Sequence, residues 1–274
     1  MLDRRKKYLQ IAFNRTLEEI AAMIGSLPLS DRIIIEAGYP LIKTYGARAI
    51  GEIKSFWGQR IFGYISGAPQ AQPFHLQNIN SLFKFNSPLI ELLLKSTEKK
   101  KIKRGRVEEI KEATFNPYII ADLKCMDRAF TEVEAAASAG ASAATCLGLA
   151  PTETINQFIK RCEEIRIDSM LDMMNIEYPF EVLSKLIKPP TIVMLHRGVD
   201  EGEENKEKEI PYHEIEIIKS TYDNILIAVA GGETINEVIR GAFNGADIIV
   251  VWRLFNESPE KITAVANEFL EETK

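Results

Sequence analysis

Polar and charged side chains that could take part in acid–base chemistry stand at the ends of short apolar segments of this sequence. The residues that share this position are Asn14, Glu36, Asp122, Lys124, Asp127, Asp172 and His196. A charged group beside an apolar strand is costly unless it is paired or binds a metal. Asp122 and Lys124 alone would fit an ordinary ion pair. So many charged groups in equivalent positions favour one functional site instead.

Two further features indicate a site for phosphate. Gly231 and Gly232 follow the apolar segment 225–230, and a helix is expected to begin near Thr234. Arg253 comes shortly after the last apolar segment. Backbone N–H groups at a helix N-terminus bind phosphate, and glycine lets a phosphate approach them closely. We therefore expect a phosphate ester as ligand, bound by Gly231, Gly232 and Arg253.

The apolar segments themselves have the length of strands, and amphipathic stretches of helix length separate nearly all of them. They are Tyr8–Phe13, Arg32–Glu36, Tyr118–Lys124, Ala143–Cys146, Ser169–Met173, Thr191–Leu195, Ile225–Ala230 and Asp247–Val251. This alternation indicates parallel strands, and eight such units close a barrel. The predicted fold is α/β, a (β/α)₈ or TIM barrel. Its active site lies at the C-terminal ends of the strands, where the polar residues fall.

One long segment interrupts this rhythm. Residues 58–117 separate a helix expected over 44–57 from the third strand, where a barrel normally has a short connection. We expect a helical insertion within a single domain of residues 1–274. It is too short to supply a substantial core of its own. We therefore expect it to pack near the barrel mouth or at a dimer interface.

Composition excludes several classes of protein. The 274 residues carry a formal net charge of -5, which offers no footprint for nucleic acid or an anionic membrane surface. The three cysteines lack the spacing of a zinc site and are too few for a disulfide framework. No apolar run is long enough to span a membrane. We expect a cytoplasmic protein whose ligand is a small molecule.

Several motifs resemble a known superfamily. Ala121-Asp-Leu-Lys-Cys-Met-Asp127 is similar to the Asp-x-Lys-x-x-Asp signature of the orotidine-monophosphate decarboxylase superfamily. Within it, Ile35-Glu-Ala-Gly38, the pattern His196-x-Gly-x-Asp200 and Val229-Ala-Gly-Gly232 look like the 3-hexulose-6-phosphate synthases. The resemblance covers nearly all of the chain except the insertion.

The resemblance assigns roles to these residues. It implies an aldolase that joins formaldehyde to ribulose 5-phosphate, or splits the product, through an enediolate. Glu36 and Asp122 would hold Mg²⁺, Lys124 would supply a fixed cation, and His196 would transfer protons. Asp127 would reach into the site of a neighbouring subunit, so the resemblance implies a homodimer with shared active sites. Asn14 and Asp172 are expected to contact substrate.

Three departures from the family pattern leave alternatives open. Asn14 stands where the family has aspartate, Tyr39 where it has threonine, and Trp252 where it commonly has glycine. A second interpretation is a sugar-acid phosphate decarboxylase of the ketogulonate-phosphate type, which uses the same enediolate. A third is a catalytically inactive barrel that binds a phosphorylated metabolite and engages a protein partner through the insertion.

Overall fold

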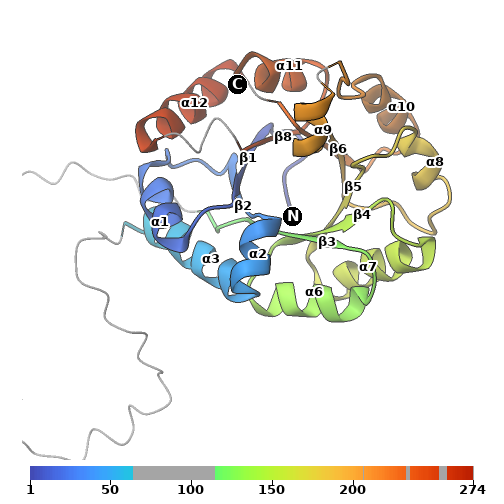
Figure 1. Ribbon diagram of the computed structural model, residues 1–274, viewed down its shortest axis with the longest axis horizontal. Helices are drawn as coiled ribbons and strands as arrows, with labels where there is room; N and C mark the ends of the chain where they lie inside the picture. The colour runs from blue at the N-terminus through green and yellow to red at the C-terminus, as the bar shows by residue number, and fades with distance from the viewer. Residues whose placement is uncertain (64–114, 206, 233–234, 253–257, 274) are drawn as a thin grey trace, which may run out of the picture. The chain divides into compact units, whose positions relative to one another are not determined.

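The computed structural model describes residues 1–274 apart from 64–114, 206, 233–234, 253–257 and 274 (Figure 1). Eight parallel strands form a closed barrel in chain order, so the predicted (β/α)₈ fold is confirmed. The strands are β1 (Tyr8–Phe13), β2 (Ile33–Ala37), β3 (Ile119–Cys125), β4 (Ala143–Leu147), β5 (Asp168–Asp172), β6 (Ile192–His196), β7 (Leu226–Ala230) and β8 (Ile248–Val251).

Helices surround this ring (Figure 1). Those of the first half are α1 (Leu17–Ser26), α2 (Tyr39–Tyr45), α3 (Arg48–Ile61), α6 (Ala129–Ser138) and α7 (Thr152–Ile165). Those of the second half are α8 (Pro179–Leu183), α9 (Val199–Glu204), α10 (His213–Thr221), α11 (Ile235–Phe243) and α12 (Pro259–Glu272).

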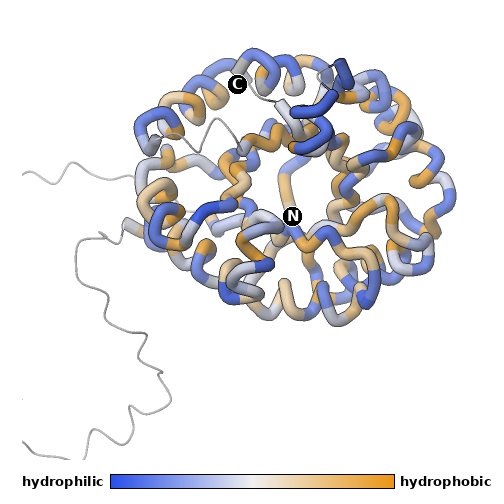
Figure 2. The backbone as a smooth tube through the Cα atoms, in the orientation of Figure 1, coloured by the Kyte–Doolittle hydropathy of each residue, from blue (hydrophilic) through white to orange (hydrophobic). Residues whose placement is uncertain are grey.

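Two apolar layers hold the barrel together. One lies between strands and helices, where Ile20, Trp57 and Phe269 are fully buried. The other fills the barrel interior, where Ile34, Met170 and Ile248 are among the buried side chains. Figure 2 shows hydrophobic residues concentrated along the ring of strands. Side chains of a strand alternate between these two layers, which leaves a few interior positions near each strand end for polar groups.

Local signals explain where several helices begin and end. Thr16 and Glu19 form the expected capping box before α1. Where one helix over 44–57 was predicted, the structure has two. Gly46, with a φ of 62°, ends α2, and α3 then runs to Ile61. The left-handed conformation at Gly46 breaks the helix because it turns the chain away from the helical path.

The N-terminal end of the barrel is closed. Leu2 packs against the interior layer together with Tyr118. Asp247 is buried there, bonded to Lys219 at 2.8 Å and to the amide of Ile227 at 2.9 Å. Any cavity of the barrel must therefore open at the opposite, C-terminal end of the strands.

The predicted insertion falls mainly outside the described residues. Its expected start at residue 58 is wrong, because α3 continues to Ile61. The expected helical cap over 58–117 otherwise stays a prediction. Among the helices that the structure describes, none is long and apolar enough to cross a membrane.

Candidate active site

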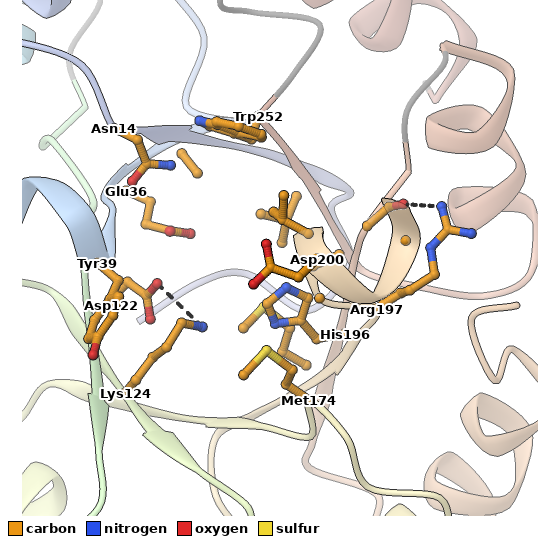
Figure 3. A pocket seen from close by; sticks show the side chains of 18 of the residues that line it. Asn14, Glu36, Tyr39, Asp122, Lys124, Met174, His196, Arg197, Asp200 and Trp252 are labelled. Carbon is orange, nitrogen blue, oxygen red and sulfur yellow. Dashed lines mark hydrogen bonds and ion pairs between the residues drawn. The ribbon is translucent and has the colours of Figure 1, made fainter. Parts of the chain in front are cut away.

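A cavity of about 420 Å³ opens at the C-terminal ends of the strands (Figure 3). Most of the predicted site residues line it. These are Asn14, Glu36, Asp122, Lys124, His196, Gly231 and Gly232. The wall also contains residues that were not predicted as site residues, among them Tyr39, Met174, Arg197, Asp200 and Trp252. The main acidic, basic and imidazole side chains predicted from the strand ends therefore line one cavity.

Asp172 connects the two basic groups of the site. The Nζ atom of Lys124 donates to Asp172 Oδ2 at 2.8 Å. The Nδ1 atom of His196 lies 2.9 Å from Asp172 Oδ1. Asp172 has no exposed surface and does not line the cavity. Its expected contact with substrate stays a prediction; the structure places it beneath the cavity, bonded to Lys124 and His196.

Electrostatics keep Asp172 and Lys124 charged. Burial by itself would raise the pKa of Asp172, but His196 and Lys124 outweigh it and lower that pKa to about 2. Burial likewise disfavours a charged Lys124, yet the carboxylates of Asp122 and Asp172 raise its pKa above the usual value. Asp172 is therefore an ionised acceptor. It accepts a hydrogen bond from the Nδ1–H of His196, which leaves Nε2 as the basic nitrogen of the ring.

An irregularity in β3 presents Lys124 to the cavity. The register between β3 and β4 shifts between Ala121 and Cys125, and Lys124 has a φ of 46°. Thr145 on β4 stabilises this bulge from both sides. Its hydroxyl accepts from the amide of Lys124 at 3.0 Å and donates to Asp122 Oδ1 at 2.8 Å. Asp122 and Lys124 lie on the same side, as residues two apart in a strand do, with Asp122 Oδ2 3.6 Å from the Lys124 ammonium.

Glu36 is the second buried carboxylate at the cavity. Gln10 on the neighbouring strand β1 donates to its Oε2 atom. Burial and the nearby charge of Asp122 raise the pKa of Glu36 to about 8. Burial also raises the pKa of Asp122. Two carboxylates that repel each other in a buried place are a typical setting for a cation.

These carboxylates fit magnesium. Mg²⁺ prefers oxygen ligands and is commonly held by one or two carboxylates together with water or substrate oxygens. Among the residues that the structure describes, no group of three or more His, Cys, Asp or Glu side chains is arranged to hold a metal. Glu36 and Asp122 are the two cavity carboxylates that could hold such an ion.

Asn14 lies at the end of β1 against Gly38. A Cβ atom at Gly38 would come within 2.0 Å of Asn14 Oδ1, so only glycine leaves room for this side chain. The Oδ1 atom is buried, and no partner for it is found among the described residues. Asn14 therefore brings an unmatched amide to the wall beside Glu36.

The remaining predicted residues are placed differently. Gly231 and Gly232 line the cavity beyond β7, as expected, whereas Arg253 lies outside the described residues. Asp127 is exposed and does not line the cavity of its own chain. It lines a separate shallow depression with Phe130 and Glu153. That position is open to a partner subunit, and its predicted role there stays a prediction.

Sequence reasoning missed the residues that support the site. Gln10 and Thr145 lie inside strands and read as ordinary strand residues. The available signal was that each is a polar residue between apolar neighbours within a strand. Asp200 was part of a quoted motif but was not assigned to the site. In Figure 3 its carboxylate points into the cavity near His196.

Comparisons with known proteins identify relatives of this chain. "Bifunctional enzyme Fae/Hps" of Methanothrix thermoacetophila is 31% identical over 269 residues, which cover 97% of this chain and 53% of that protein. The chain thus spans about half the length of the curated relatives it matches.

Solved structures share the fold. That of 3-hexulose-6-phosphate synthase from Salmonella typhimurium has a TM-score of 0.65 and 20% identity, covering 95% of this chain and 99% of the other. That of 3-keto-L-gulonate-6-phosphate decarboxylase from Vibrio cholerae has a TM-score of 0.60 and 14% identity, covering 98% and 99%. A family model matches residues 81–267, so the chain belongs to the orotidine 5'-phosphate decarboxylase / HUMPS family.

Proposed function

We propose that this protein is a magnesium-dependent carbon–carbon lyase that acts on a ketose phosphate through an enediolate. The simplest form of this activity is that of a 3-hexulose-6-phosphate synthase, which joins formaldehyde to ribulose 5-phosphate or catalyses the reverse cleavage. The observation that carries the proposal is the convergence of Glu36, Asp122, Lys124 and His196 on one cavity. Membership of the family and the similarity to Fae/Hps proteins support it.

The side chains suit each step of such a reaction. His196 Nε2 would take the proton from C1 of ribulose 5-phosphate, because Asp172 holds the opposite ring nitrogen. The Lys124 ammonium would stabilise the negative charge that develops on the enediolate oxygen. The carbon nucleophile would then attack formaldehyde, and the new alkoxide would receive a proton. Asp172 is a positioning residue in this scheme, since it holds Lys124 and His196 and does not line the cavity.

Glu36 and Asp122 would hold the magnesium ion. When bound, it would supply a Lewis acid that polarises the substrate's carbonyl and hydroxyl oxygens. Gln10 and Thr145 keep one oxygen of each carboxylate fixed, which limits their movement. Such bonds to ligating carboxylates orient them toward the metal.

The phosphate group would bind at the other side of the cavity. Gly231 and Gly232 line that side, and Arg253 follows β8, the neighbouring strand. The loops after the last two strands are the usual phosphate site of such barrels. This arrangement would place C1 of the sugar near Lys124 and His196, at the far end of the ligand from its phosphate.

The oligomer we propose is a homodimer in which Asp127 enters the partner's site. The support is a set of exposed apolar side chains that follow β3 and β4, namely Met126, Phe130 at the start of α6, and Leu149. Asp127 lies between the first two of them in the chain. Burial of these side chains by a second copy would bring Asp127 to the interface.

A substrate assay tests the proposal. Purified protein is mixed with Mg²⁺, ribulose 5-phosphate and formaldehyde, and the loss of formaldehyde is followed together with the new hexulose phosphate. We expect turnover that stops on chelation of the metal and is absent in Glu36→Gln. In a parallel reaction, 3-keto-L-gulonate 6-phosphate is supplied and carbon dioxide release is measured. Release there without aldol activity would favour the decarboxylase instead.

An exposed carboxylate supplies the control. Glu203→Gln removes a charge from α9 without touching the cavity lining. It should retain full activity. If neither reaction proceeds although the protein binds a sugar phosphate, the protein is a binding barrel, and the proposed lyase activity is wrong.

A further inference from the structure

Arg197 follows β6 directly and supports the glycine loop after β7 from behind. Its Nη2 atom donates to the carbonyl oxygen of Gly231 at 2.8 Å. Its own amide donates to the carbonyl of Ala230 at 3.1 Å, which continues the pairing of the two strands. The backbone and side chain of one residue therefore both bind the start of this loop.

The bond to Gly231 determines the direction of the next amide. In a trans peptide the C=O and the following N–H point in opposite directions, and no described peptide bond is cis. In Figure 3, Arg197 lies on the opposite side of the view from Glu36 and Lys124. The N–H of Gly232 in the same peptide consequently faces away from the Arg197 guanidinium, and Gly232 lines the cavity.

The contact between the two residues is close enough to require glycine. Gly231 has a φ of 107°, a conformation that other residues rarely adopt. A Cβ atom there would lie 2.6 Å from the carbonyl oxygen of Arg197 and 2.9 Å from its Cβ. The close packing of Gly231 against Arg197 therefore restricts the orientation of the peptide between Gly231 and Gly232.

The other end of the guanidinium is anchored as well. Nη1 donates to the carbonyl of Lys208 at 3.1 Å, and Lys208 forms an ion pair with Glu201 of α9. Glu201 in turn accepts from the amide of Gly198 at 3.3 Å. Arg197 therefore links the glycine loop to the chain that covers β6. A lysine could not hold two carbonyls with one planar group.

We infer that Arg197 is a positioning residue for the phosphate of the substrate, which it serves by aiming the Gly232 amide into the cavity. This inference rests on the proposed function, because it assumes a phosphorylated substrate at that loop. A donor fixed before binding costs no reorganisation when the anion arrives. Loss of Arg197 should therefore weaken phosphate binding more than it slows the chemistry at the far end of the sugar.

Binding of inorganic phosphate tests this without turnover. Phosphate is titrated into wild type, Arg197→Met and Arg197→Lys, and the Kd is measured by ³¹P NMR. We expect both variants to bind about tenfold more weakly. The matched control is Arg48→Met, which removes an exposed arginine that pairs only within α3. It should bind phosphate as wild type does.

Kinetics separate positioning from a general structural role. With the sugar phosphate as substrate, KM should rise about tenfold in both Arg197 variants while kcat stays within about twofold. The inference is overturned if phosphate affinity is unchanged, if lysine restores it fully, or if kcat falls while KM holds.

A further measurement on the wild-type protein covers the case in which the variants do not fold. The Gly232 amide resonance should shift on phosphate addition, and an unmoved resonance would overturn the inference. If phosphate binding responds as expected but no lyase activity is found, the inference stands and the proposed function fails.

Discussion

At the scale of single residues, the two basic groups of the site share one buried partner that does not line the cavity. Asp172 is buried beneath the cavity and binds both the ammonium of Lys124 and Nδ1 of His196. It thereby fixes the tautomer of the imidazole and the position of the cation. An asparagine has nearly the same shape but no charge. Substitution therefore separates the electrostatic contribution of Asp172 from its packing.

We expect Asp172→Asn to lower kcat by about 100-fold, because the amide does not enforce the tautomer that makes Nε2 basic. The variant should also change acid stability. The folded pKa of about 2 lies below the ordinary 3.8, so ionised Asp172 stabilises the fold above about pH 4, and this stabilisation is lost as the pH falls toward 2.

The measurements for this prediction are steady-state kinetics and denaturant unfolding between pH 2 and 7. Asp172→Asn should show a shallower loss of stability at acid pH than wild type. Asp223→Asn, at an exposed loop position, is the control and should behave as wild type. Wild-type kcat in Asp172→Asn would contradict the assigned role.

At the scale of elements, the bulge between β3 and β4 sets the backbone that carries Lys124. Regular alternation already puts Asp122 and Lys124 on one face of the sheet and Leu123 on the other, so the bulge changes the backbone at Lys124 rather than the face. The shifted register and the left-handed backbone of Lys124 bring its ammonium next to Asp122 and Asp172. Thr145 is the residue that satisfies both the irregular amide and the buried carboxylate.

Thr145→Val removes the hydroxyl while keeping the shape of the side chain. It should destabilise the protein by about 1–3 kcal/mol, because the Lys124 amide and a buried carboxylate each lose a partner. It should also lower kcat. Thr145→Ser keeps the hydroxyl and should restore most of both. Equal stability and activity for the valine and serine variants would show that the hydroxyl does not support the bulge.

At the scale of the whole molecule, the position of Asp127 makes the proposed dimer testable by complementation. Lys124→Met and Asp127→Asn should each be inactive alone. Co-expressed, they form mixed dimers in which one site has both wild-type residues, so about one quarter of wild-type activity should return.

The control for this mixture pairs two residues of the same cavity. Lys124→Met co-expressed with Glu36→Gln should recover nothing, because both residues line one cavity of one chain. Light scattering shows whether dimers form. A monomer, or a dimer without recovered activity in the first mixture, would contradict a shared site.

The sequence by itself determined the fold and the main charged groups of the site. Strand length, alternation with amphipathic helices and the polar strand ends are local patterns, and each of the eight expected strands is present within one or two residues of its expected bounds. Because the C-terminal ends of parallel strands meet at one edge, Glu36, Asp122, Lys124 and His196 could be placed together without coordinates.

Only the tertiary structure decided how these groups are supported. The burial of Asp172, the bulge held by Thr145, the pairing of Gln10 with Glu36 and the grip of Arg197 on Gly231 all depend on contacts between neighbouring strands. Such contacts follow from register and from positive φ values, which local residue patterns do not specify. The sequence shows which reactive side chains are present. Their charge states and the directions in which they point depend on the closed barrel.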